Sequence, residues 1–391
     1  MDKKNKNLYV TTPIYYVNDV PHIGHAYTTV ICDTIASFNK WLDKNVNFLT
    51  GTDEHGQKVE KSALKVGIDP QTFTDNVSKS FYKLANKLEI NNTDFIRTTE
   101  NRHKESVKHL WNKLEDKGYI YLDKYSGWYS IKDEAFYSND EVTENNKGIK
   151  IAPNGSEVEW VEEPSYFFNL SSWQDKLLKF YNDNPEFISP RSRYNEVLSF
   201  VNNGLEDLSI SRTTFNWGIQ VPKNNDHIIY VWLDALTNYI SALGYPNKDS
   251  QDWKSFWPAD IHVVGKDILR FHAVYWPAFL MAADIAVPKK IYAHGWWTVD
   301  GKKMSKSTGN VVDPNYIIDK YGLDQFKYFL LREVRFGQDG DFSEEALIKR
   351  VNSDLSNDYG NLAQRVLSFI YKNNEALLPT KGVLSIKDKE L

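Results

Sequence analysis

The alternation of strand-like and helix-like segments in the first part of the chain constrains its fold most strongly. Residues 8–16, LYVTTPIYY, are rich in β-branched and aromatic side chains and predict a buried strand. Apolar residues then recur at helical spacing over 27–42. Residues 46–56 predict a second strand, and helical patterns follow over 62–90 and 100–118. Such alternation is typical of a parallel α/β sheet.

Polar side chains suited to a ligand follow both predicted strands. Residues 17–25 contain His22 and His25 beside a predicted helix start, and residues 50–56 carry carboxylates. Ligands of parallel sheets bind at the carboxyl ends of the strands, and a helix N-terminus attracts phosphate. The histidine pair adds donors that can gain charge near neutral pH, and Gly24 lets a flat ligand approach the backbone. Taken alone, the pattern also fits ordinary loop or cap histidines.

The pattern changes between about residue 119 and residue 225. Residues 119–142 alternate like antiparallel β-structure, which indicates an insertion splitting the first domain. Strand-then-helix patterns return over 228–240 and 260–280. Residues 271–287 predict a buried helix, and residues 291–310 predict a strand followed by a hairpin that turns at Asp300-Gly301. From about residue 345 onward the pattern is helical.

Composition narrows the class of protein. The 391 residues suggest about two or three domains, and 41% hydrophobic with 14% aromatic residues argues against disorder. The single cysteine, Cys32, excludes an intrachain disulfide and a CxxC zinc knuckle, and fits a reducing compartment. We find no signal peptide or membrane span and expect a cytoplasmic protein without membrane contact. A net charge of −5 disfavours a non-specific nucleic-acid coat.

A second motif, KKMSKSTGN at residues 302–310, offers lysine and serine donors to phosphate. By itself it also fits a solvated basic turn. HIGH at 22–25 followed by KMSKS at 303–307, each beside a predicted strand end, resembles the signature pair of class I aminoacyl-tRNA synthetases. The stretches TTPIYYVNDVPHIGH, GTDEHGQKVE, YVWLDALTNY, VGKDILRFHAVYWPA and DYGNLAQR are similar to those of methionyl-tRNA synthetases, so the resemblance covers about residues 8–370.

The resemblance implies an α/β fold: a Rossmann-like parallel sheet split by a β-rich connective insertion. It implies the catalytic domain at 1–118 and 226–295, the insertion at 119–225, a KMSKS stem-contact segment at 296–355 and the start of a helical anticodon-binding domain at 356–391. The implied reaction is ATP-dependent activation of L-methionine to methionyl-adenylate, followed by transfer to tRNA(Met). The triphosphate implies Mg²⁺, and protein groups would supply alignment and charge stabilisation.

Site residues are carried over from the matching motifs. The resemblance implies catalysis by His22, His25, Lys303 and Lys306, and ATP binding by His22, Gly24, His25, Gly265, Asp267, His294, Lys303, Ser305 and Lys306. The adenine is expected near the backbone of 294–297. The implied methionine pocket comprises Ile14, Tyr16, Asp53, Trp232, Ala235, Leu236, Tyr239, Ile268 and His272. Aromatic and aliphatic walls suit a thioether, and Asp53 would accept from the substrate ammonium. Without the resemblance, Trp232, Tyr239 and His272 fit ordinary core packing.

The chain departs from the family pattern in two places. The insertion lacks the cysteines that form zinc knuckles in many relatives, so we expect no zinc, with aromatic packing by Trp128, Tyr129, Phe136 and Tyr137 in its place. Relatives continue into a larger anticodon-binding bundle. Here only Asn361 and Arg365 match anticodon-contact positions, so we expect that the chain is truncated. With an incomplete anticodon-binding domain, it should activate methionine but charge tRNA poorly. We also expect a monomer.

Three rival functions remain at this stage. Another class I synthetase would need the large editing insertion of the branched-chain enzymes, which does not fit between 119 and 225, or the zinc thiolates of the cysteine enzyme. A small HxxH nucleotidyltransferase would lack both the insertion and the helical end. A catalytically inactive, synthetase-like RNA-binding protein would have no reason to keep both phosphate-binding motifs.

Overall fold

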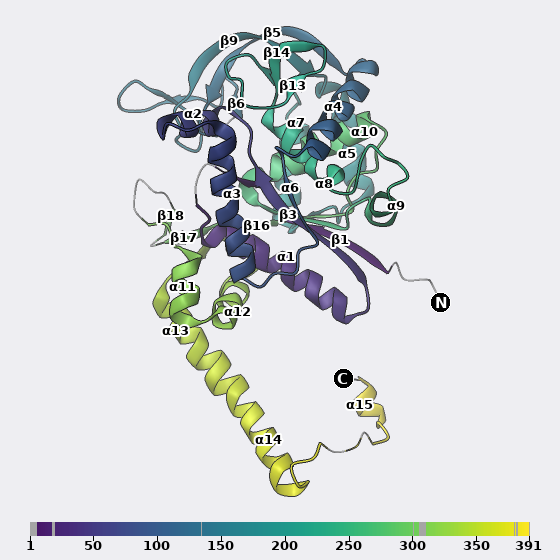
Figure 1. Cartoon of the computed structure of the whole chain (residues 1–391), viewed down its shortest axis with the longest axis vertical. Helices are drawn as coiled ribbons and strands as arrows, with labels where there is room; N and C mark the ends of the chain where they lie inside the picture. Colours follow the sequence, from purple (N-terminus) through teal and green to yellow (C-terminus); the bar gives the residue numbers. More distant parts are fainter. Residues whose placement is uncertain are drawn as a thin grey trace.

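The computed structural model describes residues 6–17, 20–133, 135–299, 301–304, 310–378, 380 and 382–390. Within them, a seven-stranded sheet has the order β10-β16-β15-β1-β3-β2, with β4 paired to β3, and all of its pairs are parallel (Figure 1). Its strands are β1 (Asn7–Thr11), β2 (Tyr15–Tyr16), β3 (Asn45–Asp53), β4 (Asp94–Arg97), β10 (Ile188–Ser189), β15 (Ile261–Gly265) and β16 (Ile291–His294). The predicted parallel α/β fold is confirmed.

Side chains of the central strands alternate between two buried cores. On β1, Tyr9 packs into the core that contains Trp111 and Trp276, whereas Leu8 and Val10 pack into the core on the other face. Consecutive residues of a strand point to opposite faces, so both faces of the sheet are covered. This double coverage explains why the central strands carry apolar residues in unbroken runs.

Helices cover both faces of the sheet. The N-terminal ones are α1 (Ile23–Trp41), α2 (Gln57–Lys65), α3 (Pro70–Lys87) and α4 (Asn101–Asp116). The helical structure predicted over 62–90 is confirmed, but it is divided between α2 and α3, because the chain turns at Gly67 with φ +74°. There Asp69 caps the new helix by accepting from the N–H of Thr72 at 2.9 Å, and Pro70 occupies its first position.

The predicted antiparallel insertion is confirmed as β-structure. Strand β5 (Ile120–Ser130) pairs antiparallel with β9 (Glu159–Phe168) and with β6 (Ala135–Tyr137). Figure 1 places this long ribbon beyond one end of the parallel sheet. The segment also contains β7 (Thr143–Glu144), β8 (Lys150–Ile151), α5 (Gln174–Asp183), α6 (Arg191–Asn202), β11 (Leu208–Ser209), β12 (Ser211–Arg212) and β13 (Gln220–Val221).

The segment 228–240 departs from its prediction in one respect. Its strand, β14 (Asn224–Ile229), pairs antiparallel with β12 and β13 in a separate sheet and does not join the parallel one. The helical part is present as α7 (Val231–Leu236) and α8 (Asn238–Ser241), followed by α9 (Gln251–Phe256). Hydrophobic pattern alone does not reveal the partner of a strand, because partners are set by long-range packing.

Two further predictions need correction. Residues 8–16 form β1 and β2 rather than one strand, with Pro13 between them. Residues 271–287 form a π-helical turn (Phe271–Tyr275) and α10 (Trp276–Ala282), so residues 283–287 are not helical.

The predicted hairpin is confirmed by antiparallel pairing of β17 (Trp297–Val299) with β18 (Lys302–Lys303). Asp300 of its turn lies outside the described residues.

The remainder is mainly helical, as predicted from residue 345 onward. Figure 1 shows α14 leading away from the sheet. The elements are α11 (Pro314–Tyr321), α12 (Leu323–Glu333), β19 (Gly340–Asp341), α13 (Glu344–Arg350), a π-helical segment (Val351–Gly360), α14 (Asn361–Asn373) and α15 (Ile386–Glu390).

Candidate active site

A cavity of 690 Å³ lies at the carboxyl ends of β1, β3, β15 and β16. This is the edge at which the sequence predicts a ligand. The predicted ATP and methionine positions outside residues 303–306 all line this cavity: Ile14, Tyr16, His22, Gly24, His25, Asp53, Trp232, Ala235, Leu236, Tyr239, Gly265, Asp267, Ile268, His272 and His294.

His22 and His25 form a reciprocal cap at the start of α1. The N–H of Gly24 donates to Nδ1 of His22 at 3.0 Å, and the N–H of His22 donates to Nδ1 of His25 at 3.0 Å. Since both Nδ1 atoms accept, each neutral ring carries its hydrogen on Nε2. The arrangement places two imidazole N–H donors at the positive end of a 19-residue helix.

Charge on the histidine pair differs from the sequence-based expectation. Burial, with a smaller contribution from neighbouring His22, lowers the pKa of His25 well below its ordinary value. The ring packs edge-on against Tyr15 and Phe81, with centroids 5.0 and 5.2 Å apart. The prediction that both histidines gain charge near neutral pH is therefore wrong for His25, which is neutral, accepts a hydrogen bond at Nδ1 and carries its hydrogen on Nε2.

Two glycines leave room for neighbouring side chains around the cavity. A Cβ on Gly24 would lie 2.8 Å from Cε1 of His22, and a Cβ on Gly265 would lie 2.5 Å from Oδ1 of Asp267. The same Asp267 oxygen accepts a hydrogen bond from Nε1 of Trp296 at 3.0 Å. Gly265 therefore lets the Asp267 carboxylate fold back to the rim of the cavity.

The chain that follows β16 forms another wall. Nδ1–H of His294 donates to the carbonyl of Gly295 at 2.8 Å, so Nε2 accepts from the hydroxyl of Thr28 at 2.8 Å. Burial lowers the pKa of His294, so the ring is neutral. A Cβ on Gly295 would lie only 2.1 Å from the carbonyl oxygen of Gln338, so the two backbones are in direct contact.

The opposite side of the cavity is aromatic and apolar. Trp232 of α7 stacks on Phe271 with ring centroids 3.6 Å apart and planes 8° apart. Ala235 and Leu236 follow on the same helix and also line the cavity. Asp53, 6% exposed, brings a carboxylate to this region from the end of β3. Such a pocket suits an apolar side chain next to a cationic group.

A buried pair of polar groups closes this pocket. Nδ1–H of His272 donates to the carbonyl of Ile268 at 2.9 Å, so its Nε2 accepts from the hydroxyl of Tyr239 at 2.7 Å. Burial lowers the pKa of His272 to about 4 and raises the pKa of Tyr239 far above its ordinary value. Both groups are therefore neutral near pH 7.

Five predicted site residues are not among the described residues that line the cavity, and three of them lie wholly or partly outside the described part of the chain. The backbone of Lys303 pairs with Thr298 in the β17–β18 hairpin. Ser305 and Lys306 lie outside the described residues. Asn361 and Arg365 are exposed on α14, which Figure 1 shows extending away from the sheet.

Sequence reasoning missed several residues that line the cavity. Phe271 and Asn238 could have been found from helical spacing, because each lies one turn or less from a predicted pocket residue. Lys58, Lys132, Asp133, Tyr137 and Asn154 come from α2 and the insertion. Their presence depends on how the insertion folds back over the sheet, which no local pattern encodes.

The described residues contain neither a cluster of metal-binding side chains nor a helix suited to a membrane. No group of three or more histidine, cysteine, aspartate or glutamate side chains within the described ranges is placed to hold a metal ion. None of the helices in this part of the chain has the length and apolarity needed to span a membrane. The absence of zinc stays a prediction.

Comparison with known proteins identifies the family. The family described as tRNA synthetases class I (M) matches residues 8–367. This chain belongs to the methionyl-tRNA synthetases. The methionine–tRNA ligase of Rickettsia conorii is 62% identical over 382 residues, which are 97% of this chain and 74% of the relative. That of Rhizobium meliloti is 53% identical over 383 residues, which are 98% and 74% of the two chains.

Solved structures give the same family. A Mycobacterium tuberculosis methionyl-tRNA synthetase in complex with methionyl-adenylate matches with a TM-score of 0.94 at 50% identity, over 98% of this chain and 75% of that chain. The apo form from the same organism matches with a TM-score of 0.84 at 46% identity, over 100% and 74% of the two chains. This synthetase is therefore an ATP-using methionine–tRNA ligase, and the rival enzyme families are set aside.

Proposed function

We propose that the 690 Å³ cavity binds L-methionine and ATP side by side and forms methionyl-adenylate there. One observation carries the proposal: a single cavity combines neutral imidazole donors at a helix N-terminus with an aromatic pocket beside the Asp53 carboxylate. The first part suits a triphosphate, and the second suits an apolar amino acid with a free ammonium.

At the methionine end, Asp53 accepts from the substrate ammonium, and the thioether lies among Ile14, Tyr16, Trp232, Ala235, Leu236, Tyr239, Ile268 and His272. The Tyr239 hydroxyl already donates to His272. The hydroxyl therefore presents an oxygen lone pair to the substrate sulfur and cannot donate to it. Selectivity at this contact depends on the shape of the side chain more than on hydrogen bonding.

At the ATP end, the substrate carboxylate attacks the α-phosphorus and pyrophosphate leaves with the electron pair of the broken P–O bond. Nε2–H of His22 and His25 stabilises the charge that develops on the phosphate oxygens. Lys303, Ser305 and Lys306 neutralise the departing pyrophosphate. Gly24 leaves room for the nucleotide, Gly265 and Asp267 hold the ribose, and the adenine lies on the backbone of 294–297 near His294.

The second step transfers the methionyl group to the terminal adenosine of tRNA(Met). A ribose hydroxyl attacks the carbonyl carbon of the adenylate, and AMP leaves. We propose that Asn361 and Arg365, exposed on α14, contact the anticodon. The domain boundaries at residues 118, 225, 295 and 355 are part of the same proposal.

Magnesium enters this proposal with ATP. The donors around the expected phosphate position are imidazole N–H groups, whereas Mg²⁺ takes oxygen ligands. The ion is therefore held mainly by the triphosphate oxygens, where it neutralises negative charge. We propose no zinc, a monomer in which one chain supplies the whole cavity, and a cytoplasmic location suited to the buried thiol of Cys32.

The test separates the two ends of the cavity by steady-state ATP–pyrophosphate exchange. D53N removes a charge-assisted hydrogen bond and should raise the KM for methionine roughly 10- to 100-fold, leaving the KM for ATP within about twofold. H25N keeps an oxygen that can cap α1 but loses the Nε2 donor, and should lower kcat roughly 100-fold. Equal effects of D53N on both KM values would contradict the assignment.

A further inference from the structure

A fully buried carboxylate lies directly behind the methionine pocket and takes no part in the steps above. Asp234 is 0% exposed and belongs to α7, the helix whose Trp232, Ala235 and Leu236 line the cavity. Residues of an α-helix are separated by about 100° around its axis. Asp234 therefore points away from the cavity, into the protein behind its wall.

Two histidines from distant parts of the chain donate to this carboxylate. Nδ1 of His55 lies 2.6 Å from Oδ2 of Asp234, and Nε2 of His103 lies 2.7 Å from Oδ1. An ionised carboxylate only accepts, so each of these nitrogens carries a hydrogen. Burial alone would raise the pKa of Asp234, but the two histidines outweigh it and hold the pKa at about 2.

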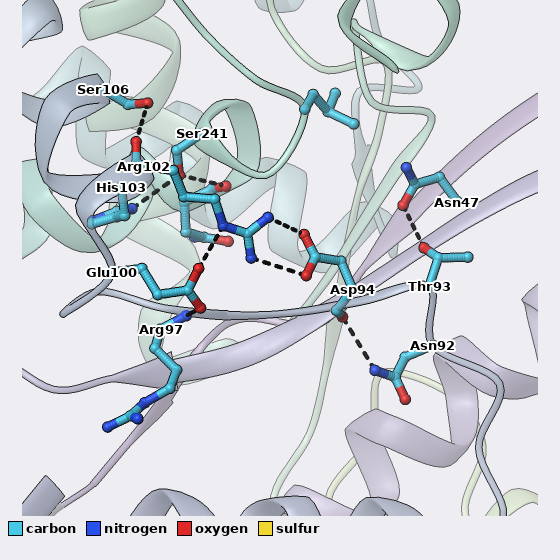
Figure 2. Close-up of polar contacts among 12 residues, drawn as sticks. Asn47, Asn92, Thr93, Asp94, Arg97, Glu100, Arg102, His103, Ser106 and Ser241 are labelled. Carbon is cyan, nitrogen blue, oxygen red and sulfur yellow. Dashed lines mark hydrogen bonds and ion pairs between the residues drawn. The ribbon is translucent and has the colours of Figure 1, made fainter. Parts of the chain in front are cut away.

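The contacts continue into two further elements. Nδ1 of His103 lies 2.9 Å from Oγ of Ser241 in α8, and Figure 2 shows this pair together with the start of α4. One residue earlier, Arg102 makes two hydrogen bonds to Asp94 of β4, at 2.7 and 3.0 Å. His103 is therefore presented by a helix whose first turn is fixed to the parallel sheet.

The second histidine lies on the segment that carries the ammonium acceptor. His55 is two residues after Asp53, in the loop between β3 and α2. One carboxylate therefore links the loop of Asp53 to the helix of Trp232, Ala235 and Leu236. The separation of these two parts sets the length of amino acid that fits between them.

We propose that Asp234, His55 and His103 form a positioning unit that fixes the spacing between Asp53 and the apolar wall of the methionine pocket. The inference rests on the proposed function, because it assumes that Asp53 and α7 bind methionine. These three are positioning residues, since they act through Asp53 and α7 without touching the substrate. The unit determines methionine affinity and the rejection of side chains of similar shape.

The chemistry of the unit suits this role. Helix α7 has only six residues, too few to hold its position without tertiary contacts. Apolar contacts tolerate small sliding movements, whereas charge-assisted hydrogen bonds are short and directional. A carboxylate held from two sides therefore fixes both the position and the rotation of α7.

The experiment compares truncating and conservative variants of both histidines. H55A and H103A remove the donors, whereas H55N and H103Q keep an N–H near Nδ1 and Nε2 respectively. S106A is the matched control: Ser106 is equally buried one turn along α4 and donates to the carbonyl of Tyr245, not to Asp234. D53N reports on the pocket assignment itself. Each variant is tested by ATP–pyrophosphate exchange with methionine and with norleucine, and by thermal unfolding.

We expect H55A and H103A to raise the KM for methionine at least roughly tenfold and to leave the KM for ATP within about twofold. The ratio of kcat/KM for methionine to kcat/KM for norleucine should also fall. H55N and H103Q should recover most of the loss, and S106A should show none of it. If D53N raises the KM for methionine but H55A and H103A change only the unfolding temperature, the positioning unit is refuted and the proposed function stands. If D53N has no selective effect, the proposed function fails first.

Discussion

Buried neutral histidines dominate the residue-scale electrostatics of this synthetase. Burial lowers the pKa of His25, His262, His272 and His294. In the unfolded chain each would bind a proton below an ordinary pKa of about 6.5. The unfolded state therefore binds more protons than the folded state below that pH. Stability should fall as the pH drops from about 6.5 toward the lowered folded-state values.

His272 offers the clearest test of this linkage. Its folded pKa of about 4 leaves it neutral at pH 5, where the unfolded chain is protonated. One such group contributes a slope of about 1.4 kcal/mol per pH unit. H272Q cannot titrate and should reduce the loss of stability between pH 6.5 and 5 by about 2 kcal/mol. Urea unfolding at several pH values measures it, and an unchanged slope would contradict the assignment.

Many single residues of the candidate site could be predicted from the sequence, but the hydrogen bonds that join them could not. HIGH and KMSKS identify His22 and His25 because the whole motif is local. The pairing of Asp234 with His55 and His103 joins positions 179 and 131 residues apart. No periodicity connects them, and WLDALTNY alone gives Asp234 no partner. Hydrogen positions on the rings likewise follow from neighbours that only the fold supplies.

At the scale of elements, local breakers decided where predictions succeeded or failed. The helix over 100–118 was predictable because its apolar spacing is unbroken, and it appears as α4. The pattern over 62–90 did not show where one helix ends and the next begins, and in the structure Gly67 and Pro70 mark that boundary. The π-helical turn at 271–275 was not predictable, since its irregular winding depends on packing around Phe271 and His272.

The contact between the chain after β16 and the segment before β19 gives an element-scale prediction. G295A would place a Cβ 2.1 Å from the carbonyl oxygen of Gln338. The two segments cannot easily move apart, because the N–H of Gly340 donates a hydrogen bond to the carbonyl of Trp296 at 2.8 Å. We expect a loss of about 2–3 kcal/mol and a raised KM for ATP, measured by denaturant unfolding and exchange kinetics. G382A, where no atom lies within 4 Å of the added Cβ, should instead be neutral or stabilising.

The turn between β5 and β6 tests the prediction of a zinc-free insertion. Asp133 accepts from Ser130 Oγ at 2.9 Å and from Tyr137 OH at 3.2 Å. Trp128 packs edge-on against Trp160 with centroids 5.3 Å apart, and the Phe136 side chain lies outside the described part. D133A should cost about 1–2 kcal/mol of stability, and D123A, on the exposed part of β5, almost nothing.

Metal removal completes that test. Dialysis against a chelator should leave the unfolding temperature unchanged, because hydrogen bonds around Asp133 fix this turn. The exchange activity should be fully recovered when Mg²⁺ alone is added back with ATP. Elemental analysis should find far less than one zinc per chain. The prediction would be refuted if the protein contained about one zinc per chain and lost both the zinc and stability on chelation. The turn between β5 and β6 would then be held by the metal and not by Asp133.

At the scale of the whole molecule, the cavity is built from segments far apart in sequence. Residues 13–58 and 231–304 supply its floor and walls, and residues 132–154 of the insertion complete the rim. The sheet edge was predictable, since parallel strands gather their carboxyl ends. The contribution of the insertion was not, because its antiparallel ribbon carries no signal for the direction in which it folds back.

The most direct measurement is ATP–pyrophosphate exchange with methionine and, separately, with each other standard amino acid. It tests whether one cavity performs adenylation selectively for methionine. The structure predicts exchange with methionine alone, strongly reduced by D53N. Exchange that is absent from folded protein, or that is supported equally by leucine or isoleucine, would contradict the central claim.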